Sequence, residues 1–82
     1  MWHVYIIKCS DGSLYTGITT DIPRRIDEHN SGRGGSYTRV RKPVKLIYSE
    51  SCFDRSGALK REAEIKSWPR NKKLALIKKG HD

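Results

Sequence analysis

The sequence has 82 residues, with 17 Lys and Arg against nine Asp and Glu, which gives a formal net charge of +8 at pH 7. A chain this short buries only about 60% of the surface that its unfolded state exposes, so we expect one modest core and a single domain over residues 1–82. Two distant cysteines argue against a disulfide framework and a structural zinc site, and the short apolar runs argue against a signal peptide and a membrane span, so we expect a soluble, cytoplasmic protein with no membrane partner.

The first predicted elements are two strands, residues 2–8 (WHVYIIK) and 13–18 (SLYTGI), because both stretches are rich in β-branched and aromatic residues. They flank the turn sequence CSDGS and together predict a β-hairpin. The length of its loop decides which side chains share a face of the sheet. A two-residue loop would place Tyr5 and Tyr15 on opposite faces, whereas a three-residue loop over residues 10–12 would place them on the same face.

We favour the three-residue loop, because its Ser, Asp and Gly suit a type I turn that is closed by a glycine in the left-handed region. This register pairs Tyr5 with Gly17. Because Gly17 has no side chain, we expect open space opposite the Tyr5 ring, in which a ligand could lie. The residues predicted on this face are His3, Tyr5, Ile7, Tyr15 and Gly17, and those predicted on the other face are Val4, Ile6, Leu14 and Ile18.

A helix is predicted after the hairpin, in the stretch TTDIPRRIDEHNSG, where Asp21 is a favourable N-cap and Gly32 a favourable end. Its two isoleucines form the apolar stripe. At about 100° per residue, Arg25 and His29 lie one turn apart along the edge of that stripe. We therefore expect these two side chains to point toward the same place.

The remaining elements follow a glycine-rich segment. The stretch SGRGGSYTRVRKP predicts a loop with a short helical turn around Tyr37, and VKLIY, residues 44–48, predicts a third strand. The stretch DRSGALKREAEIKSW predicts the main helix, with Asp54 or Ser56 as its cap and a proline at its end. The stretch NKKLALIKK predicts a last short helix that ends at Gly80.

One carboxylate on the main helix is out of place. At about 100° per residue, Glu62 falls between Leu59 and Ile65, in the middle of the apolar stripe, whereas Glu64 points away from it. A carboxylate that faces a core is costly unless it is paired or bound to a cation. One explanation is a helical salt bridge to Lys66, worth about 0.3–0.5 kcal/mol. The other is a metal ligand, because Mg²⁺ is often held by one carboxylate together with waters and a substrate phosphate.

Two stretches of the chain carry Lys and Arg but no acidic residue. We call them the first basic tract, residues 33–45, and the second basic tract, residues 66–79. One interpretation is that at least one tract contacts the phosphates of nucleic acid, and the other is that both are solvated surface. The sequence does not show whether the two tracts meet in space.

The order of these features resembles the GIY-YIG nuclease superfamily: a first-strand Tyr, a Tyr-x-Gly on the second strand, an Arg and a His four apart on the next helix, and a lone Glu on a later helix. The two motif halves read HVY (residues 3–5) and YTG (residues 15–17), and the resemblance extends over about residues 3–73. It is greatest to the small, free-standing bacterial members often called YhbQ/YazA-like. The chain departs from the pattern where HV replaces Gly-Ile and where Thr16 replaces Ile, but both tyrosines and the last glycine remain.

The resemblance implies an α/β fold, a sandwich with a central three-stranded antiparallel β-sheet flanked by α-helices. It also implies a divalent-metal-dependent endonuclease that hydrolyses DNA phosphodiester bonds in DNA repair or processing, with an activity that could be weak. In this family pattern, Glu62 would hold one Mg²⁺ or Mn²⁺ ion, Arg25 would neutralise the scissile phosphate, and Tyr15 would activate or orient the attacking water. The residues that would complete the hydrogen-bonded pocket are Tyr5, His29 and Tyr37.

DNA is therefore the expected partner, with RNA as an alternative, and no small-molecule cofactor is expected. A protein partner could supply the specificity that so small a domain lacks. Two other functions on the same fold stay open, a non-catalytic nucleic-acid-binding module and an adaptor that docks onto a larger protein. Metal-dependent cleavage separates the enzyme from both, and salt-dependent binding separates the module from the adaptor.

Overall fold

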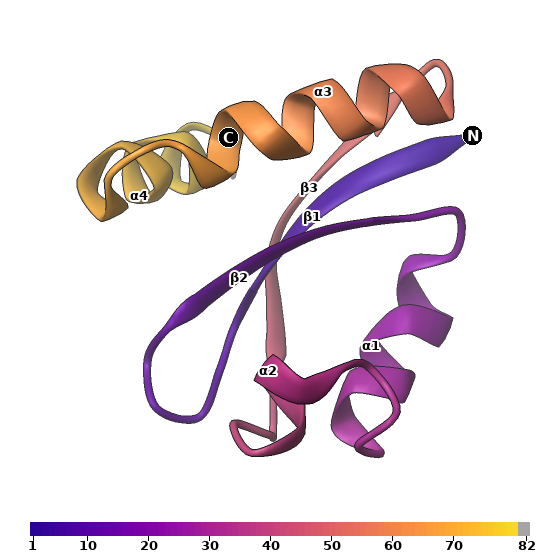
Figure 1. The fold of residues 1–82 in the computed structure, drawn as a ribbon. Coiled ribbons are helices and arrows are strands. Elements are labelled where there is room, and N and C mark those ends of the chain that lie inside the picture. The colour runs from indigo at the N-terminus through magenta and orange to yellow at the C-terminus, as the bar shows by residue number, and fades with distance from the viewer. Residues whose placement is uncertain (81–82) are drawn as a thin grey trace.

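The structure, a computed structural model, describes residues 1–80. Its strands form one antiparallel sheet in the order β2-β1-β3, with α1 and α2 on one face and α3 and α4 on the other (Figure 1). The expected sandwich is confirmed. None of the helices within residues 1–80 has the length and apolarity that crossing a membrane requires. The elements are β1 (Trp2–Lys8), β2 (Leu14–Thr19), α1 (Ile22–Asn30), α2 (Ser36–Arg39), β3 (Lys45–Cys52), α3 (Arg55–Lys66) and α4 (Arg70–Lys79).

The β1–β2 hairpin has the predicted three-residue loop. The Gly12 amide donates to the Cys9 carbonyl at 2.9 Å, and Gly12 has a φ of 86°, in the left-handed region that favours glycine. Tyr5 consequently pairs with Gly17, and Ile7 pairs with Tyr15. The register that places both tyrosines on one face is therefore confirmed.

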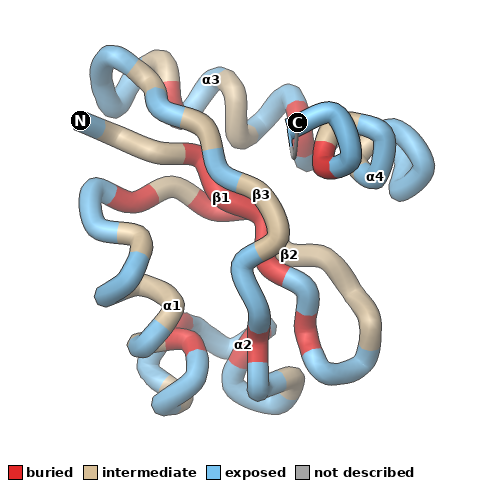
Figure 2. Tube along the Cα trace, turned by 180° about the vertical axis from the view of Figure 1, so that it is seen from behind, coloured by how far each residue is buried: buried red, intermediate tan, exposed pale blue. Residues whose placement is uncertain are grey.

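The central strand β1 separates two hydrophobic clusters, and its buried residues form a continuous stretch in the middle of the molecule (Figure 2). Alternate side chains of a strand point to opposite faces, so β1 supplies both clusters. The cluster under α3 and α4 contains Val4, Ile6, Ala58, Ile65 and Ile77. The cluster under α1 contains Tyr5, Ile7, Cys9 and Val44, with Tyr15, Ile22 and Ile26 packed against it.

The third strand is longer than the sequence predicts, because β3 extends from Lys45 to Cys52. Its second half, SESC, is mostly polar and gives no apolar signal, but it lies at a sheet edge and pairs with the first residues of β1. The register shifts between Ile6, which pairs with Tyr48, and Ile7, which pairs with Leu46. One extra residue on β3 therefore forms a bulge.

Capping side chains define where the two longer predicted helices begin. The Asp21 carboxylate accepts from the Arg24 amide at 3.1 Å at the start of α1. At the start of α3, the Asp54 carboxylate accepts from the Gly57 amide at 2.8 Å. Of the two caps that the sequence allowed for the main helix, Asp54 is therefore the one used.

Candidate active site

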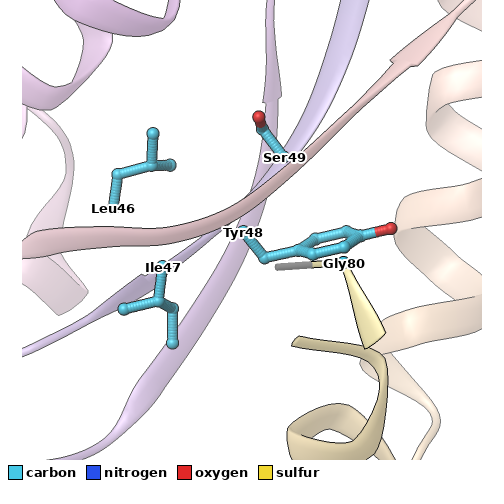
Figure 3. Close-up of a pocket in the computed structure, with 5 residues that line it drawn as sticks. All are labelled: Leu46, Ile47, Tyr48, Ser49 and Gly80. Carbon is cyan, nitrogen blue, oxygen red and sulfur yellow. The ribbon is translucent and has the colours of Figure 1, made fainter. Parts of the chain in front are cut away.

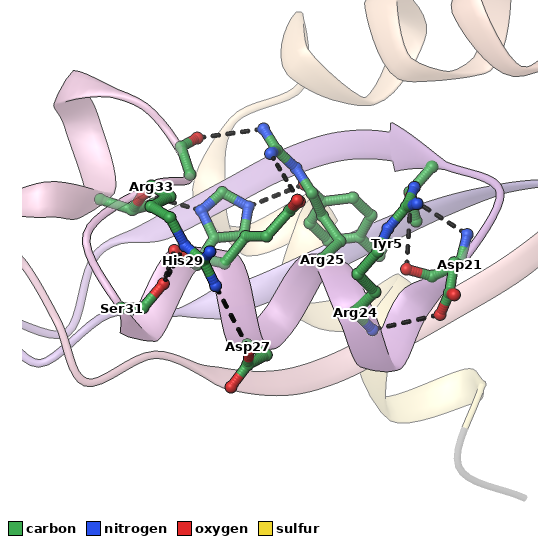
Figure 4. A network of polar contacts seen from close by, with 12 residues as sticks. Tyr5, Asp21, Arg24, Arg25, Asp27, His29, Ser31 and Arg33 are labelled. Atoms are coloured by element: carbon green, nitrogen blue, oxygen red, sulfur yellow. Dashed lines mark hydrogen bonds and ion pairs between the residues drawn. The ribbon is translucent and has the colours of Figure 1, made fainter.

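Tyr5 is the centre of the candidate site. Its side chain is buried in the sheet, and its hydroxyl lies 2.9 Å from Nε2 of His29 and 3.4 Å from Nε of Arg25 (Figure 4). The helical spacing of Arg25 and His29 predicted that the two side chains point toward the same place, and this is confirmed. The place where they meet is the phenol of the first strand.

The imidazole of His29 is fully buried, with 0% of the residue exposed, and it bridges two hydroxyl groups. Nδ1 lies 2.7 Å from Oγ1 of Thr38, opposite the Nε2 contact with Tyr5. Burial, aided by the nearby charge of Arg25, lowers the pKa of His29 below its usual 6.5, so the ring is neutral at pH 7. His29 is therefore an interior residue and not a polar residue at an exposed helix end.

Arg25 can only donate, so the Tyr5 hydroxyl accepts from it. Because a hydroxyl oxygen can accept two hydrogen bonds, both neutral tautomers of His29 satisfy its contacts with Tyr5 and Thr38. We expect the tautomer with its proton on Nδ1, in which Tyr5 donates to Nε2 and Nδ1 donates to Thr38, because the Tyr5 proton then also has an acceptor.

Arg25 is held on three sides. Besides Tyr5, it donates from Nη1 to the Glu28 carboxylate at 3.2 Å and from Nη2 to the Gly34 carbonyl at 3.0 Å, and about 30% of its side chain is exposed. These contacts use three of the five N–H groups of the guanidinium, so two remain without an acceptor in residues 1–80. Arg25 is thus a positioned, partly exposed cation at the margin of the site.

The space opposite Gly17 differs from our expectation. A Cβ atom at Gly17 would lie 2.5 Å from the Tyr5 hydroxyl oxygen, because the Tyr5 ring lies across the glycine. The prediction of open space for a ligand at this point is therefore wrong. The missing side chain makes room for the phenol that contacts Arg25 and His29.

Two further tyrosines, Tyr15 and Tyr37, pack beside this chain. The rings of Tyr15 and Tyr37 are stacked, with centroids 5.7 Å apart, and the rings of Tyr15 and His29 make a T-shaped contact with centroids 5.4 Å apart. Tyr37 therefore joins the site by stacking. Neither the Tyr15 nor the Tyr37 hydroxyl has a hydrogen-bond partner among residues 1–80, so the expected hydrogen-bonding role of Tyr37 is not formed by the protein alone.

The surroundings of Tyr5 and Tyr15 give the two hydroxyls different roles. Burial raises the pKa of Tyr5 above 10.0, and Arg25 opposes this shift only in part, so Tyr5 stays a phenol at neutral pH. Its hydroxyl is also occupied by His29 and Arg25. Tyr15 is half-buried, and its hydroxyl, which has no hydrogen-bond partner in the described part of the chain, is not buried.

Glu62 reaches the site from α3. Its Oε2 lies 3.5 Å from Nζ of Lys66, so the salt bridge that the sequence allowed is formed, and 19% of the Glu62 side chain is exposed. Lys66 in turn lies 5.9 Å from the ring centroid of Tyr15. Burial is the main cause of the raised pKa of Tyr5, and the negative charges of Tyr15 and, last, Glu62 add to it. Glu62 is therefore linked to Tyr15 through Lys66, and its charge acts on Tyr5 from a distance.

The apolar face of α3 is narrower than predicted. Ala58 and Ile65 are buried, but Leu59 is 39% exposed, so Glu62 lies at the edge of the buried face and not in its middle. This edge position lets its carboxylate reach solvent. Glu64 points elsewhere and pairs with Arg61 at 2.6 Å, as the helical period predicted.

The donor set around Glu62 fits only one kind of metal site. Within the described part of the chain, no group of three or more His, Cys, Asp or Glu side chains is arranged to hold a metal ion. A single, partly exposed carboxylate suits a hydrated Mg²⁺ or Mn²⁺ ion whose remaining ligands are waters and substrate oxygens. It does not suit a cage made by the protein alone.

Sequence reasoning missed two residues that support the site, Thr38 and Gly34. Thr38 is 1% exposed and contacts His29, and the Gly34 carbonyl accepts from Arg25. A Cβ atom at Gly34 would overlap the His29 imidazole. The glycine-rich run GRGG was a signal of close approach, whereas nothing in the local pattern marks Thr38.

A pocket of about 220 Å³ lies elsewhere, on the edge strand β3 (Figure 3). It is lined by Leu46, Ile47, Tyr48, Ser49 and Gly80. None of the predicted site residues lines it. The candidate active site is therefore a set of converging side chains and not this hollow.

The sequence matches the family model described as the GIY-YIG catalytic domain over residues 1–75. The UPF0213 protein SSP2268 of Staphylococcus saprophyticus is 55% identical over 78 residues, 95% of each chain, and the UPF0213 protein SA0446 of Staphylococcus aureus is 59% identical over 75 residues, 92% of each chain.

Two solved structures are also similar. The solution structure of the UPF0213 protein BH0048 from Bacillus halodurans is 45% identical, with a TM-score of 0.62 and coverage of 98% of this chain and 87% of that one. The solution structure of EF2693 from E. faecalis is 44% identical, with a TM-score of 0.64 and coverage of 96% and 84%.

Proposed function

The chain belongs to the GIY-YIG catalytic domain family, a family of nucleases, and from this premise we propose that it is a divalent-metal-dependent nuclease that hydrolyses phosphodiester bonds of DNA. The observation that carries the proposal is the linked set of contacts among Tyr5, Arg25, His29 and Tyr15. DNA is the proposed partner because the chain carries a net charge of +8, which favours a polyanion.

Arg25 binds the phosphate that is attacked. Its contacts with Tyr5, Glu28 and Gly34 fix the plane of the guanidinium, and two N–H groups remain for phosphate oxygens. A positioned guanidinium can donate two parallel hydrogen bonds to one phosphate and stabilise the charge that develops in the transition state. Because the side chain is held before substrate arrives, little reorganisation accompanies the reaction.

Tyr15 orients the attacking water through its hydroxyl. The edge-on contact with His29 and the stack with Tyr37 hold the ring, and the hydroxyl has no hydrogen-bond partner within residues 1–80. In the hydrolysis, the water oxygen forms a new bond to phosphorus and the bond from phosphorus to one bridging oxygen breaks. The water gives up one proton, and the departing oxygen takes one up from solvent or a positioned water.

Tyr5 and His29 hold this arrangement together. The Tyr5 hydroxyl stays protonated and connects Arg25 to the neutral His29 ring, which in turn contacts Tyr15. Their burial keeps water away from one side of the site. We therefore assign them to positioning.

Glu62 would hold the divalent ion, with waters and substrate oxygens as the other ligands. When bound, Mg²⁺ or Mn²⁺ polarises the phosphoryl oxygen and stabilises the departing oxyanion. To bind the ion, the Glu62 carboxylate must give up its contact with Lys66. That contact is an i,i+4 pair on a partly exposed surface and is worth only about 0.3–0.5 kcal/mol.

The proposal is tested with Tyr15→Phe, which removes one hydroxyl that has no partner in the protein. We expect metal-dependent nicking of supercoiled plasmid by the parent, a strong loss of nicking by Tyr15→Phe, and unchanged stability of the variant. Tyr48→Phe also removes one phenol hydroxyl, on β3 and away from the site; this hydroxyl donates to Glu50 at 2.8 Å, so the variant can lose some stability but should keep the activity. Equal nicking by the parent and Tyr15→Phe would remove Tyr15 from the reaction.

A further inference from the structure

The two basic tracts, which are far apart in the sequence, are attached to the same hairpin loop, Ser10–Gly12. Arg41 of the first tract donates from Nε to the Asp11 carboxylate at 3.0 Å. Arg70 of the second tract donates from Nη2 to the Gly12 carbonyl, also at 3.0 Å. The tracts therefore meet in space, at the end of the sheet where β1 turns into β2.

This meeting point adjoins the tyrosines of the candidate site. The Arg41 guanidinium lies 4.0 Å from the ring centroid of Tyr37, and Tyr37 stacks on Tyr15. On the side of the second tract, Nζ of Lys66 lies 5.9 Å from the ring centroid of Tyr15. Cations from both tracts thus bracket the stacked tyrosine pair.

The charge at this end of the molecule is only partly compensated. Arg41 is paired with Asp11 and Lys66 with Glu62, but the partner of Arg70 is a neutral carbonyl. Among the ion pairs formed within residues 1–80, none includes Arg70, Lys72 or Lys73. An excess of fixed positive charge attracts phosphate groups.

We propose that Arg41, Lys66 and Arg70, here called the loop rim, bind the sugar–phosphate backbone of a polynucleotide strand on both sides of Tyr15 and Tyr37. The proposal rests on the proposed function in one respect, because it places the hydrolysed bond between the two sides of the rim. The binding itself does not depend on hydrolysis. Because the Tyr37 ring is already engaged by Tyr15 and Arg41, the rim offers charge and not a free aromatic face, so it binds without base preference.

The chain contains a matched control for this proposal. Arg41→Gln with Arg70→Gln removes two charges and breaks one Arg–Asp pair. Arg33→Gln with Lys79→Gln also removes two charges and breaks one such pair, because Arg33 lies 3.7 Å from Asp27. Both double variants change the net charge from +8 to 8 − 2 = +6. Lys79 lies at the other end of α4 from Arg70.

The experiment measures the affinity for a labelled 20-nucleotide single strand and for the matching duplex by fluorescence anisotropy, in EDTA, at 50–200 mM salt. Affinity falls as salt rises, and each lost phosphate contact makes the slope of log affinity against log salt less steep, by about 0.7 for a single strand and 0.9 for a duplex. The rim variant should therefore lose about 1.4 or about 1.8 of the slope, while the control variant keeps the parent slope. Arg41→Lys with Arg70→Lys, which keeps the charge, should keep most of the slope and shows whether a loss comes from charge or from misfolding.

Equal slopes in the rim and control variants, or a parent that does not bind either oligonucleotide, would overturn the loop rim. Because EDTA prevents metal-dependent cleavage, this outcome is independent of the nuclease activity. A parent that never cleaves but shows the slope difference supports the rim and contradicts the proposed nuclease. A parent that cleaves but shows equal slopes supports the proposed nuclease and contradicts the loop rim.

Discussion

The ring of Tyr5 lies across Gly17, its partner in the β1–β2 ladder, and no side chain could be added at residue 17 without meeting the Tyr5 hydroxyl. The same hydroxyl contacts His29 and Arg25. The glycine of the second strand is therefore a packing requirement of the site, because it lets the phenol reach the helix α1.

The first prediction follows from this contact. Gly17→Ala should lower the free energy of unfolding by about 1–3 kcal/mol, as overpacking of a close-packed interior does. Urea denaturation measures the change. Gly57→Ala is the control, because its added Cβ would meet only the Asp54 carboxylate oxygen at 3.2 Å and alanine is favoured in a helix by about 1 kcal/mol. A Gly17→Ala protein as stable as the parent would contradict the observed position of the Tyr5 ring.

The second prediction concerns Thr38, whose hydroxyl contacts Nδ1 of His29 at 2.7 Å. Thr38→Val keeps the shape of the side chain but leaves a buried ring nitrogen without a partner, which should cost about 1–3 kcal/mol of stability. Thr38→Ser keeps the hydroxyl and should cost less. The ¹⁵N shifts of the His29 ring should show a proton on Nδ1 in the parent. A proton on Nε2 would reverse the direction of the chain.

The third prediction concerns pH. Because the pKa of His29 is lowered by its burial and by Arg25, the unfolded chain binds a proton near pH 6.5 that the folded chain does not. The free energy of unfolding is therefore unaffected by this group above pH 6.5 and falls as the pH decreases from 6.5 toward the lowered value. Urea unfolding at pH 7.5, 6.5 and 5.5 measures this fall, and His29→Gln should lessen it. An NMR titration that places the pKa of His29 above 6.5 would contradict it.

Parts of the site follow from local rules of the sequence. The left-handed glycine at residue 12 determines the loop length, and the two-residue period of a strand then places Tyr5, Tyr15 and Gly17 on one face. The helical period alone brings Arg25 and His29 together. These predictions succeed because each depends on neighbours within one element or one hairpin.

Other parts depend on contacts between distant segments, which no local pattern contains. The position of the Tyr5 ring, the Thr38 hydroxyl and the meeting of the two basic tracts are all of this kind. The exposure of Leu59 has the same origin, because α3 turns Ala58 and Ile65 toward the sheet and leaves Leu59 at the margin. Periodicity gives the angle between side chains but not which of them meets the core.

The fourth prediction concerns Arg25, which contacts three different groups through Nε, Nη1 and Nη2. Arg25→Lys keeps the charge but cannot make these contacts together with two more to a phosphate. We expect the rate of cleavage to fall by about 10²–10³-fold, the effect of losing one positioned donor in a transition state. Single-turnover cleavage of a labelled DNA measures it. Arg24→Lys, on the neighbouring exposed residue, should leave the rate near that of the parent.

The most direct test of the central claim, that this protein is a metal-dependent nuclease, compares Glu62→Gln with Glu64→Gln in a cleavage assay on plasmid and branched DNA with Mg²⁺ or Mn²⁺. Both variants remove one carboxylate charge from α3, but Glu62 pairs with Lys66, whose Nζ lies 5.9 Å from the ring centroid of Tyr15, whereas Glu64 pairs with Arg61. We predict that Glu62→Gln abolishes cleavage while the fold and the affinity for DNA stay nearly intact, and that Glu64→Gln cleaves like the parent. Cleavage by Glu62→Gln at the parent rate, or a parent that cleaves no nucleic acid with either metal, would contradict the claim.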